Sequence, residues 1–194
     1  MHRSSRVPGR ILACCLLAAS SAIGYSQAAA PAKPAAGTVI APAQVYGKLL
    51  SLLEKEFVGA AEAMPEDKYN FAPTTAIGEF KGVRSFGGQV KHVAEANYYF
   101  FGGPNFSEAE DKVKSDAIEK LATKAEIVQA LKDSFTQAHS FVDGITPENA
   151  YVTMPSGGTR AGMAAFGIAH FMDHYGQIAE YLRMNGIVPP ASAK

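Results

Sequence analysis

Two histidines near the C-terminus have a spacing that suits metal binding. His170 and His174 lie four residues apart within the stretch HFMDHYGQIAEYLRMNGIVPP. On a helix, side chains four residues apart lie one turn apart on the same face, so both imidazoles can reach one metal ion. The alternative is a solvated helix face. The neighbouring Phe166, Ala169 and Phe171 favour burial, and a buried imidazole is costly unless something bonds it.

A third ligand would have to come from elsewhere, because two imidazoles alone hold a divalent metal weakly. Beyond the extreme N-terminus, the other histidines are His92 and His139. His92 lies in the middle of a predicted helix, in GGQVKHVAEANYYF, and His139 lies near the end of another. A single histidine on a helix is more often an exposed or hydrogen-bonded side chain than a ligand, and this interpretation is favoured for His139.

Polar residues close to the paired histidines could support such a site. A metal-bound imidazole usually donates its second N–H to a nearby acceptor. Asp173 and Glu95 are candidates for this role by their positions in the sequence, although Asp173 is expected to face away from the ligands, as a solvated or interhelical carboxylate. Gln177 and Tyr181 continue the face of the histidine pair and either line a pocket or pack in the core.

The same segment superficially matches the His-x-x-Glu-His motif of inverted zinc proteases. Asp173 stands in the place of the glutamate and shortens the base by one methylene. Only 20 residues follow His174, which leaves little room for a helix that carries a downstream ligand. The sequence therefore argues against a peptidase.

Hydrophobic periodicity predicts an all-α domain with four main helices, and strand signals are scarce. Ser85 is the expected N-cap of the second helix, and Thr123 and Glu126 form a capping box before the third. Gly186 follows the fourth helix at the position where chains turn out of a helix. Four helices with long connections indicate a bundle. The predicted ranges are 43–64, 85–101, 123–142 and 159–185.

Two further features concern how these helices connect and pack. Residues 102–122 form a long crossover, with a short helical piece expected at 117–121. Gly87 and Gly88, in the first turns of the second helix, lower helix propensity, which indicates either space needed near the backbone or a tight helix–helix contact. The expected buried stripe of the first helix consists of Tyr46, Leu49, Leu50, Leu53, Phe57 and Ala60.

Three stretches together resemble the DinB-like superfamily of metalloenzymes, whose architecture is also called the DinB/YfiT-like fold. RSFGGQVKHVAEANYYF is similar to the second-helix pattern of that family, which carries a single ligand histidine. HFMDHYGQIAEYLRMNGIVPP closely resembles the closing helix of the family, and AEAMPEDKYNFAPT more weakly resembles the exit of its first helix. The resemblance covers residues 42–191.

The resemblance implies a four-helix bundle with a long crossover connection and a three-histidine metal site. The family ligands, transferred to this sequence, are His92, His170 and His174, and all three positions are filled. Zinc or nickel is the metal that the family implies. Three neutral imidazoles leave coordination positions free for water or substrate, and water bound to such a metal can have its pKa lowered towards 7.

We therefore expect a metal-dependent enzyme of hydrolase type that uses metal-activated water on an unidentified small-molecule substrate. Some relatives instead use low-molecular-weight thiols, so a thiol-dependent S-transferase is one alternative. These thiols are chiefly cytosolic, and the N-terminus of this chain indicates export. The other alternative is a non-catalytic metal-binding helical-bundle protein, in which the metal stabilises the fold by mass action.

The N-terminus predicts secretion to the periplasm or the medium. Arg3, Arg6 and Arg10 precede the apolar run ILACCLLAASSAIG, which is too short to span a bilayer, and small residues follow it. We assign residues 1–28 to a signal peptide, 29–41 to a flexible Ala/Pro-rich linker and 42–191 to the helical domain. No stable membrane span is expected after removal of the signal.

The composition of the predicted mature chain excludes some partners and ligands. Both cysteines, Cys14 and Cys15, belong to the predicted signal, so neither a disulfide nor a cysteine-ligated metal is expected. Removing three arginines leaves 15 basic against 18 acidic residues, a net charge of −3. This balance provides no electrostatic argument for nucleic-acid binding. An apolar helix face could support a homodimer.

Overall fold

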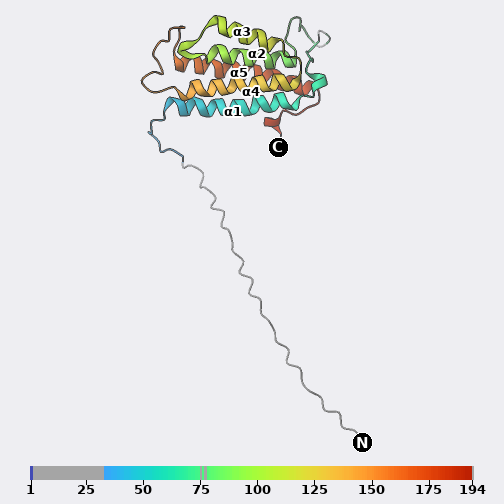
Figure 1. Ribbon diagram of the computed structural model, residues 1–194. Coiled ribbons are helices and arrows are strands. Elements are labelled where there is room, and N and C mark those ends of the chain that lie inside the picture. Colours follow the sequence, from blue (N-terminus) through green and yellow to red (C-terminus); the bar gives the residue numbers. More distant parts are fainter. Residues whose placement is uncertain (2–32, 75, 77, 194) are drawn as a thin grey trace. The chain divides into compact units, whose positions relative to one another are not determined.

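The computed structural model describes residues 33–74, 76 and 78–193, together with Met1 (Figure 1). The predicted signal peptide, apart from Met1, and residues 29–32 of the predicted linker lie outside the described residues. Residues 33–41 are exposed and contain no helix, and the first helix begins at Pro42, where the domain was predicted to begin.

The described part of the chain is helical and contains no β-strand, which confirms the all-α class. An isolated bridge joins Thr153 to Thr159. Short 3-10 turns occur at Glu66–Lys68, Gly103–Asn105 and Pro190–Ser192. The α-helices are α1 (Pro42–Ala63), α2 (Phe86–Phe100), α3 (Glu108–Glu119), α4 (Lys124–Asp143) and α5 (Arg160–Met184).

α2 and α4 begin at the N-caps predicted from the sequence. The Ser85 hydroxyl accepts a hydrogen bond of 3.2 Å from the Gly88 N–H, which satisfies a backbone donor that the helix itself cannot pair. At the start of α4, the Thr123 hydroxyl accepts from the Glu126 N–H, and the Glu126 carboxylate accepts from the Thr123 N–H. This reciprocal pair is the predicted capping box.

The C-terminus of α5 is closed by a Schellman motif around Gly186, which has a φ of +74°. The Gly186 N–H donates to the Arg183 carbonyl at 2.9 Å, and the Ile187 N–H donates to the Leu182 carbonyl at 3.0 Å. A left-handed residue is required at this point, and glycine adopts it without steric cost. The predicted end of the longest helix is therefore confirmed.

The four long helices pack in alternation. α1 packs mainly against α4 and α5, and α2 packs against the same two helices, as the ribbon also shows (Figure 1). Because consecutive helices such as α1 and α2 are not principal packing partners, long connections are needed to join them. α3 covers α2 on the side away from α1 (Figure 1).

The core lies between these four helices. In the predicted stripe of α1, Leu49 is an error, because its side chain is 43% exposed while Leu50, Leu53 and Phe57 are buried. The large, fully buried side chains come from all four helices and their connections, and they include Phe57, Phe86, Phe101, Phe135, Phe171, Leu50, Met64, Leu131, Ile178 and Leu182.

The helical piece expected at 117–121 is wrong in extent, since α3 already begins at Glu108. The sequence EAEDKVKSDAIE is charged on most sides of the helix, and Ile118 is its one buried residue. Such a helix lacks the apolar periodicity from which helices are predicted. Its start is marked instead by Ser107, whose hydroxyl accepts from the Glu110 N–H.

Close backbone contacts explain two glycines on the helices that carry the candidate site. The Gly87 N–H donates to the Tyr69 carbonyl at 2.8 Å, and a Cβ on Gly87 would lie 3.0 Å from the Tyr69 ring. The space at Gly87 is thus used mainly by the segment after α1, and the Ile127 side chain of α4 would lie 3.8 Å from the added Cβ. On α5, a Cβ on Gly167 would lie 2.6 Å from the Phe101 ring, so a larger residue would force α5 and the end of α2 apart.

Among the described residues, the structure contains no helix with the length and hydrophobicity required to span a bilayer.

Candidate metal centre

The three histidines that the sequence assigned as ligands converge in the structure. His92 lies in the middle of α2, and His170 and His174 lie one turn apart on α5. The Nε2 atom of His170 is 3.2 Å from that of His92 and 3.1 Å from that of His174. Residues separated by 78 positions thus place the same ring nitrogen towards a common point, and the three could hold one metal ion.

The cluster lies at the edge of the core. His174 is 7% exposed, whereas His92 and His170 are half-buried, so the cluster is only partly shielded from solvent. Phe171 is fully buried, but Phe166 is 62% exposed and Ala169 is also exposed, so the apolar neighbours cited for His170 do not all mark a buried helix face. The close approach of α5 and α2 at Gly167, one turn before His170, brings the two helices together here.

The second ring nitrogen of His174 is held by a chain of side-chain amides. The His174 Nδ1–H donates to Gln89 Oε1 at 2.7 Å. The Gln89 Nε2–H donates to Gln177 Oε1 at 2.7 Å, and the Gln177 Nε2–H donates to Asp173 Oδ2 at 3.0 Å. With Nδ1 protonated, the Nε2 lone pair of His174 is free to face the other two rings.

The surroundings of the rings favour neutral imidazole, the form that binds metal. Burial lowers the pKa of His174 to about 4, and the neighbouring His170, His92 and Arg84 add to this effect, while the Asp173 carboxylate opposes it. Burial also lowers the pKa of His92 to about 4, again with Arg84 and His170 contributing. The pKa of His170 is lowered by burial as well, against the opposing charge of Asp173.

The geometry and donor set fit a divalent metal. Nitrogens bonded at about 2.0–2.1 Å to a tetrahedral zinc ion lie about 3.3–3.4 Å apart, and octahedral angles bring them to about 3.0 Å. The two Nε2 separations that involve His170, 3.1 and 3.2 Å, fall between these values, and the ligand nitrogens of the three rings all lie within 4.8 Å of one another. Three neutral imidazoles, one of them with a hydrogen-bonded second nitrogen, could therefore hold a first-row metal ion. The distances do not select one metal.

His170 differs from His174 in its second nitrogen. The Nδ1 atom of His170 is buried and has no hydrogen-bond partner among the described residues. The ring is instead packed edge-on against Phe100, with ring centroids 5.2 Å apart. A buried nitrogen without a partner is costly, so coordination at Nε2 would offset part of the cost of placing this imidazole here.

The remaining residues singled out in the sequence lie outside the cluster. His139, on α4, contacts Glu54 of α1, with Nε2 2.7 Å from Oε2, and does not join the other three histidines. Tyr181 donates from its hydroxyl to the Arg84 carbonyl at 3.2 Å and packs in the core. Asp173 is exposed and, together with Gln177, reaches the cluster only through hydrogen bonds.

Glu95, the other predicted support for a ligand, makes no hydrogen bond to the three rings in the described part of the chain. It lies one turn after His92 on α2, and one of its carboxyl oxygens is buried without a partner. Burial raises the pKa of Glu95 to about 7, and the nearby Glu119 carboxylate, at the end of α3, contributes to the rise.

Gln89 is the residue that sequence analysis missed. Its side chain is 3% exposed and links α2 to α5. The available signal was its position: Gln89 lies three residues before His92, one turn away on the same face. A buried amide needs partners, and a ligand histidine with a free N–H is one of them.

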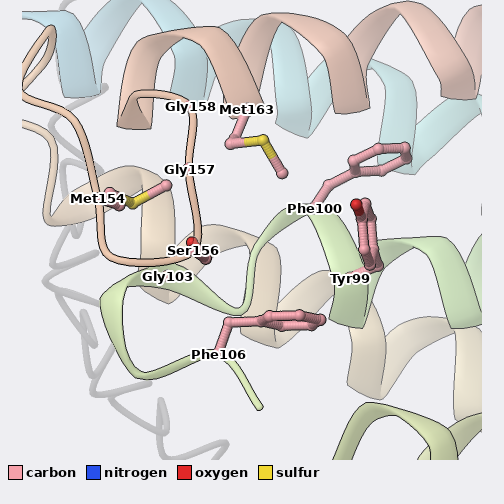
Figure 2. Close-up of a pocket in the computed structure, with 9 residues that line it drawn as sticks. All are labelled: Tyr99, Phe100, Gly103, Phe106, Met154, Ser156, Gly157, Gly158 and Met163. Carbon is pink, nitrogen blue, oxygen red and sulfur yellow. The ribbon is translucent and has the colours of Figure 1, made fainter. Parts of the chain in front are cut away.

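A pocket of about 250 Å³ lies near the cluster, and none of the three histidines lines it. Phe100 lines this pocket and also packs against His170, so its ring separates the two. Figure 2 shows aromatic side chains from the end of α2 and from the connection after it facing two methionines and a glycine loop. The lining residues are Tyr99, Phe100, Gly103, Phe106, Met154, Ser156, Gly157, Gly158 and Met163.

Comparison with known proteins is consistent with this geometry. The sequence model of one protein family, described as the DinB superfamily, matches residues 49–178. That range includes all three histidines of the cluster and most of the helical domain. A comparison with curated individual proteins gives no match. The family resemblance is thereby confirmed, and the chain belongs to the DinB superfamily.

Proposed function

We propose that this chain is a metal-dependent enzyme of hydrolase type, in which His92, His170 and His174 hold one divalent metal ion. The observation that carries the proposal is the convergence of three neutral imidazoles at the edge of the core, with the Nε2 atom of His170 3.2 Å from that of His92 and 3.1 Å from that of His174. We propose zinc or nickel as the metal, and availability decides between them because three imidazoles accept several ions.

The bound metal would supply Lewis acidity and would lower the pKa of water that reaches it. The protein's part is to keep the three rings neutral and fixed. Burial lowers the pKa values of His92 and His174 to about 4, so the ligand form persists at neutral pH. The Gln89 amide holds the ring of His174 from behind.

The pocket on the far side of Phe100 is a candidate for part of a small-molecule substrate. Three aromatic rings and two methionines line it together with polar groups of the glycine loop. A pocket near the cluster supports an enzyme over the alternative of a non-catalytic metal-binding protein, which needs none. The second alternative, a thiol-dependent S-transferase, is disfavoured by the predicted export of the chain.

An assay with defined probes separates these alternatives. Zinc- and nickel-loaded protein is mixed with p-nitrophenyl acetate and butyrate, and separately with 1-chloro-2,4-dinitrobenzene plus glutathione. Metal-dependent ester hydrolysis that His170→Ala abolishes and His139→Ala preserves would support the proposal. Turnover only in the presence of the thiol would favour the S-transferase, and metal binding without turnover of either probe would favour the non-catalytic protein.

We further propose that the protein acts in the periplasm or outside the cell, after removal of residues 1–28. The support is the sequence alone, with three arginines before a short apolar run. N-terminal sequencing of protein from the periplasmic fraction and the medium tests this. A first residue near Ala29 is expected, and an intact N-terminus in the cytosolic fraction would contradict it.

A further inference from the structure

The hydrogen-bond chain behind His174 runs in one direction, and an exposed residue sets that direction. The carboxylate of Asp173 lies at one end, and a carboxylate can accept but not donate. The amide of Gln177 must therefore turn its N–H towards Asp173, which leaves its oxygen facing Gln89. Gln89 in turn must present its N–H to Gln177 and its oxygen to the ring.

The last link fixes the tautomer of the imidazole. Because Gln89 presents an oxygen, the His174 nitrogen that faces it, Nδ1, has to carry the proton. The proton is then absent from Nε2, the atom that lies 3.1 Å from the Nε2 of His170. The chain crosses from α5 to α2 and back, since Asp173, Gln177 and His174 lie on α5 and Gln89 lies on α2.

We propose that Asp173, acting through Gln177 and Gln89, is a positioning residue that fixes the Nδ1–H tautomer of His174 and thereby strengthens metal binding by the three-histidine site. This inference rests on the proposed metal site. It assigns a role to three residues that are not ligands, one of which is exposed and does not touch the cluster. Among the three histidines, and within the described part of the chain, only His174 has a hydrogen bond on its second ring nitrogen, Nδ1.

Asp173→Asn is the decisive variant, because it keeps the shape of the side chain and removes the charge that makes this residue an acceptor only. An asparagine can donate as well as accept, so the whole chain can reverse with every hydrogen bond retained. In the reversed chain Gln89 donates to Nδ1, and the proton of His174 moves to the metal-facing Nε2. Two directions of similar energy would halve the competent population, which predicts at least about a twofold weaker metal affinity.

The matched control lies on α4, where Gln129 donates to Asp133 at 2.8 Å in an exposed pair of the same chemistry. Asp133→Asn should leave the metal affinity unchanged. Gln89→Met removes the contact with His174 altogether and should weaken binding by about 10–100-fold. Because Gln89 is buried, a thermal melt of Gln89→Met must show that this variant is still folded. Asp173→Asn changes an exposed residue, so we do not expect it to affect folding.

Gln89→Glu provides the rescue. A carboxylate at position 89 can only accept from His174 Nδ1–H, so the tautomer no longer depends on Asp173. Adding Asp173→Asn to Gln89→Glu should therefore cause no further loss of affinity, although the same change weakens binding in the wild-type background. A general structural effect of Asp173→Asn would instead appear equally in both backgrounds.

Two measurements test the proposal, namely Co(II) and Zn(II) affinity by chelator competition and the ¹⁵N chemical shifts of the His174 ring in the metal-free protein. We expect an Nδ1–H ring in the wild type, a mixture of tautomers in Asp173→Asn, and a parallel fall in affinity. An Nε2–H ring in the wild type would overturn the proposal, as would an Asp173→Asn protein identical to the wild type in both measurements. If the wild type binds no metal, the proposed function fails, while the ring measurement still decides whether Asp173 fixes the tautomer.

Discussion

Two histidine environments in this fold differ in what faces the ring nitrogens. In the cluster of His92, His170 and His174, the Nε2 atoms face one another, and the one protein acceptor on a second nitrogen is the neutral amide of Gln89. In the second environment, between α1 and α4, the Nε2 of His139 lies 2.7 Å from the carboxylate of Glu54.

The consequence is a difference in what each site can bind. Three nitrogens brought together disfavour positive charge, and burial lowers the pKa values of the three cluster rings. The Nε2 of His139 instead contacts a single carboxylate at a partly exposed position. The same residue type on the same kind of helix is therefore suited to a metal in one region and to a side-chain contact between two helices in the other.

The largest expected effect is the loss of metal from the cluster. His170→Ala removes the ring whose Nε2 contacts both other nitrogens, and the two that remain hold a divalent metal weakly. Elemental analysis of protein purified without a histidine tag should give about one metal ion per chain for the wild type and nearly none for the variant. Equal metal content in the wild type and in His170→Ala would show that the three-histidine cluster is not the metal site, and the contrast with His139 would no longer hold.

An effect of intermediate size is expected from pH in the metal-free protein. The pKa values of His92 and His174 are about 4 in the folded state, against about 6.5 for an unperturbed histidine. The unfolded chain therefore binds more protons between these values, and the free energy of unfolding should fall as the pH falls from about 6.5 towards 4. Urea unfolding with a chelator present measures this slope.

The control for the pH effect is a variant in which all three cluster histidines are replaced by Asn. Its free energy of unfolding should depend less steeply on pH in this range, because the groups that must stay neutral in the fold are gone. His139 is retained in this variant. A slope equal to that of the wild type would assign the pH effect to other groups.

The smallest effect is expected at His139. The His139→Ala change removes a partly exposed pair with Glu54, and such pairs contribute about 0–1 kcal/mol to the free energy of unfolding. Metal content should not change. A loss of metal in this variant would place His139 among the groups that hold the ion, and the distinction drawn between the two histidine environments would be wrong.

Much of the fold could be predicted because local signals agree with the packing. The caps at Ser85 and Thr123 and the turn at Gly186 satisfy backbone groups that every helix must satisfy, so short patterns suffice to locate them. α3 could not be placed, because a helix that buries only Ile118 leaves almost no apolar period. Leu49 fits the period of α1 but points to solvent, which only the packing of neighbouring helices decides.

The candidate site was predictable for a different reason. The i, i+4 spacing of His170 and His174 indicates a shared face, but only the family resemblance selected His92 over His139 as the third residue. Spacing along the chain does not show that α2 packs against α5 where Gly167 allows close approach. For the same reason the link from Gln89 to Gln177, across 88 positions, could not be read from the sequence.

The most direct test of the central claim is X-ray absorption spectroscopy at the metal edge of zinc- or nickel-loaded protein, with His170→Ala as the comparison. We expect three imidazole nitrogens at about 2.0–2.1 Å together with oxygen ligands in the wild type. A metal that shows only oxygen ligands, or one whose imidazole count is the same in His170→Ala, would contradict a site built from His92, His170 and His174.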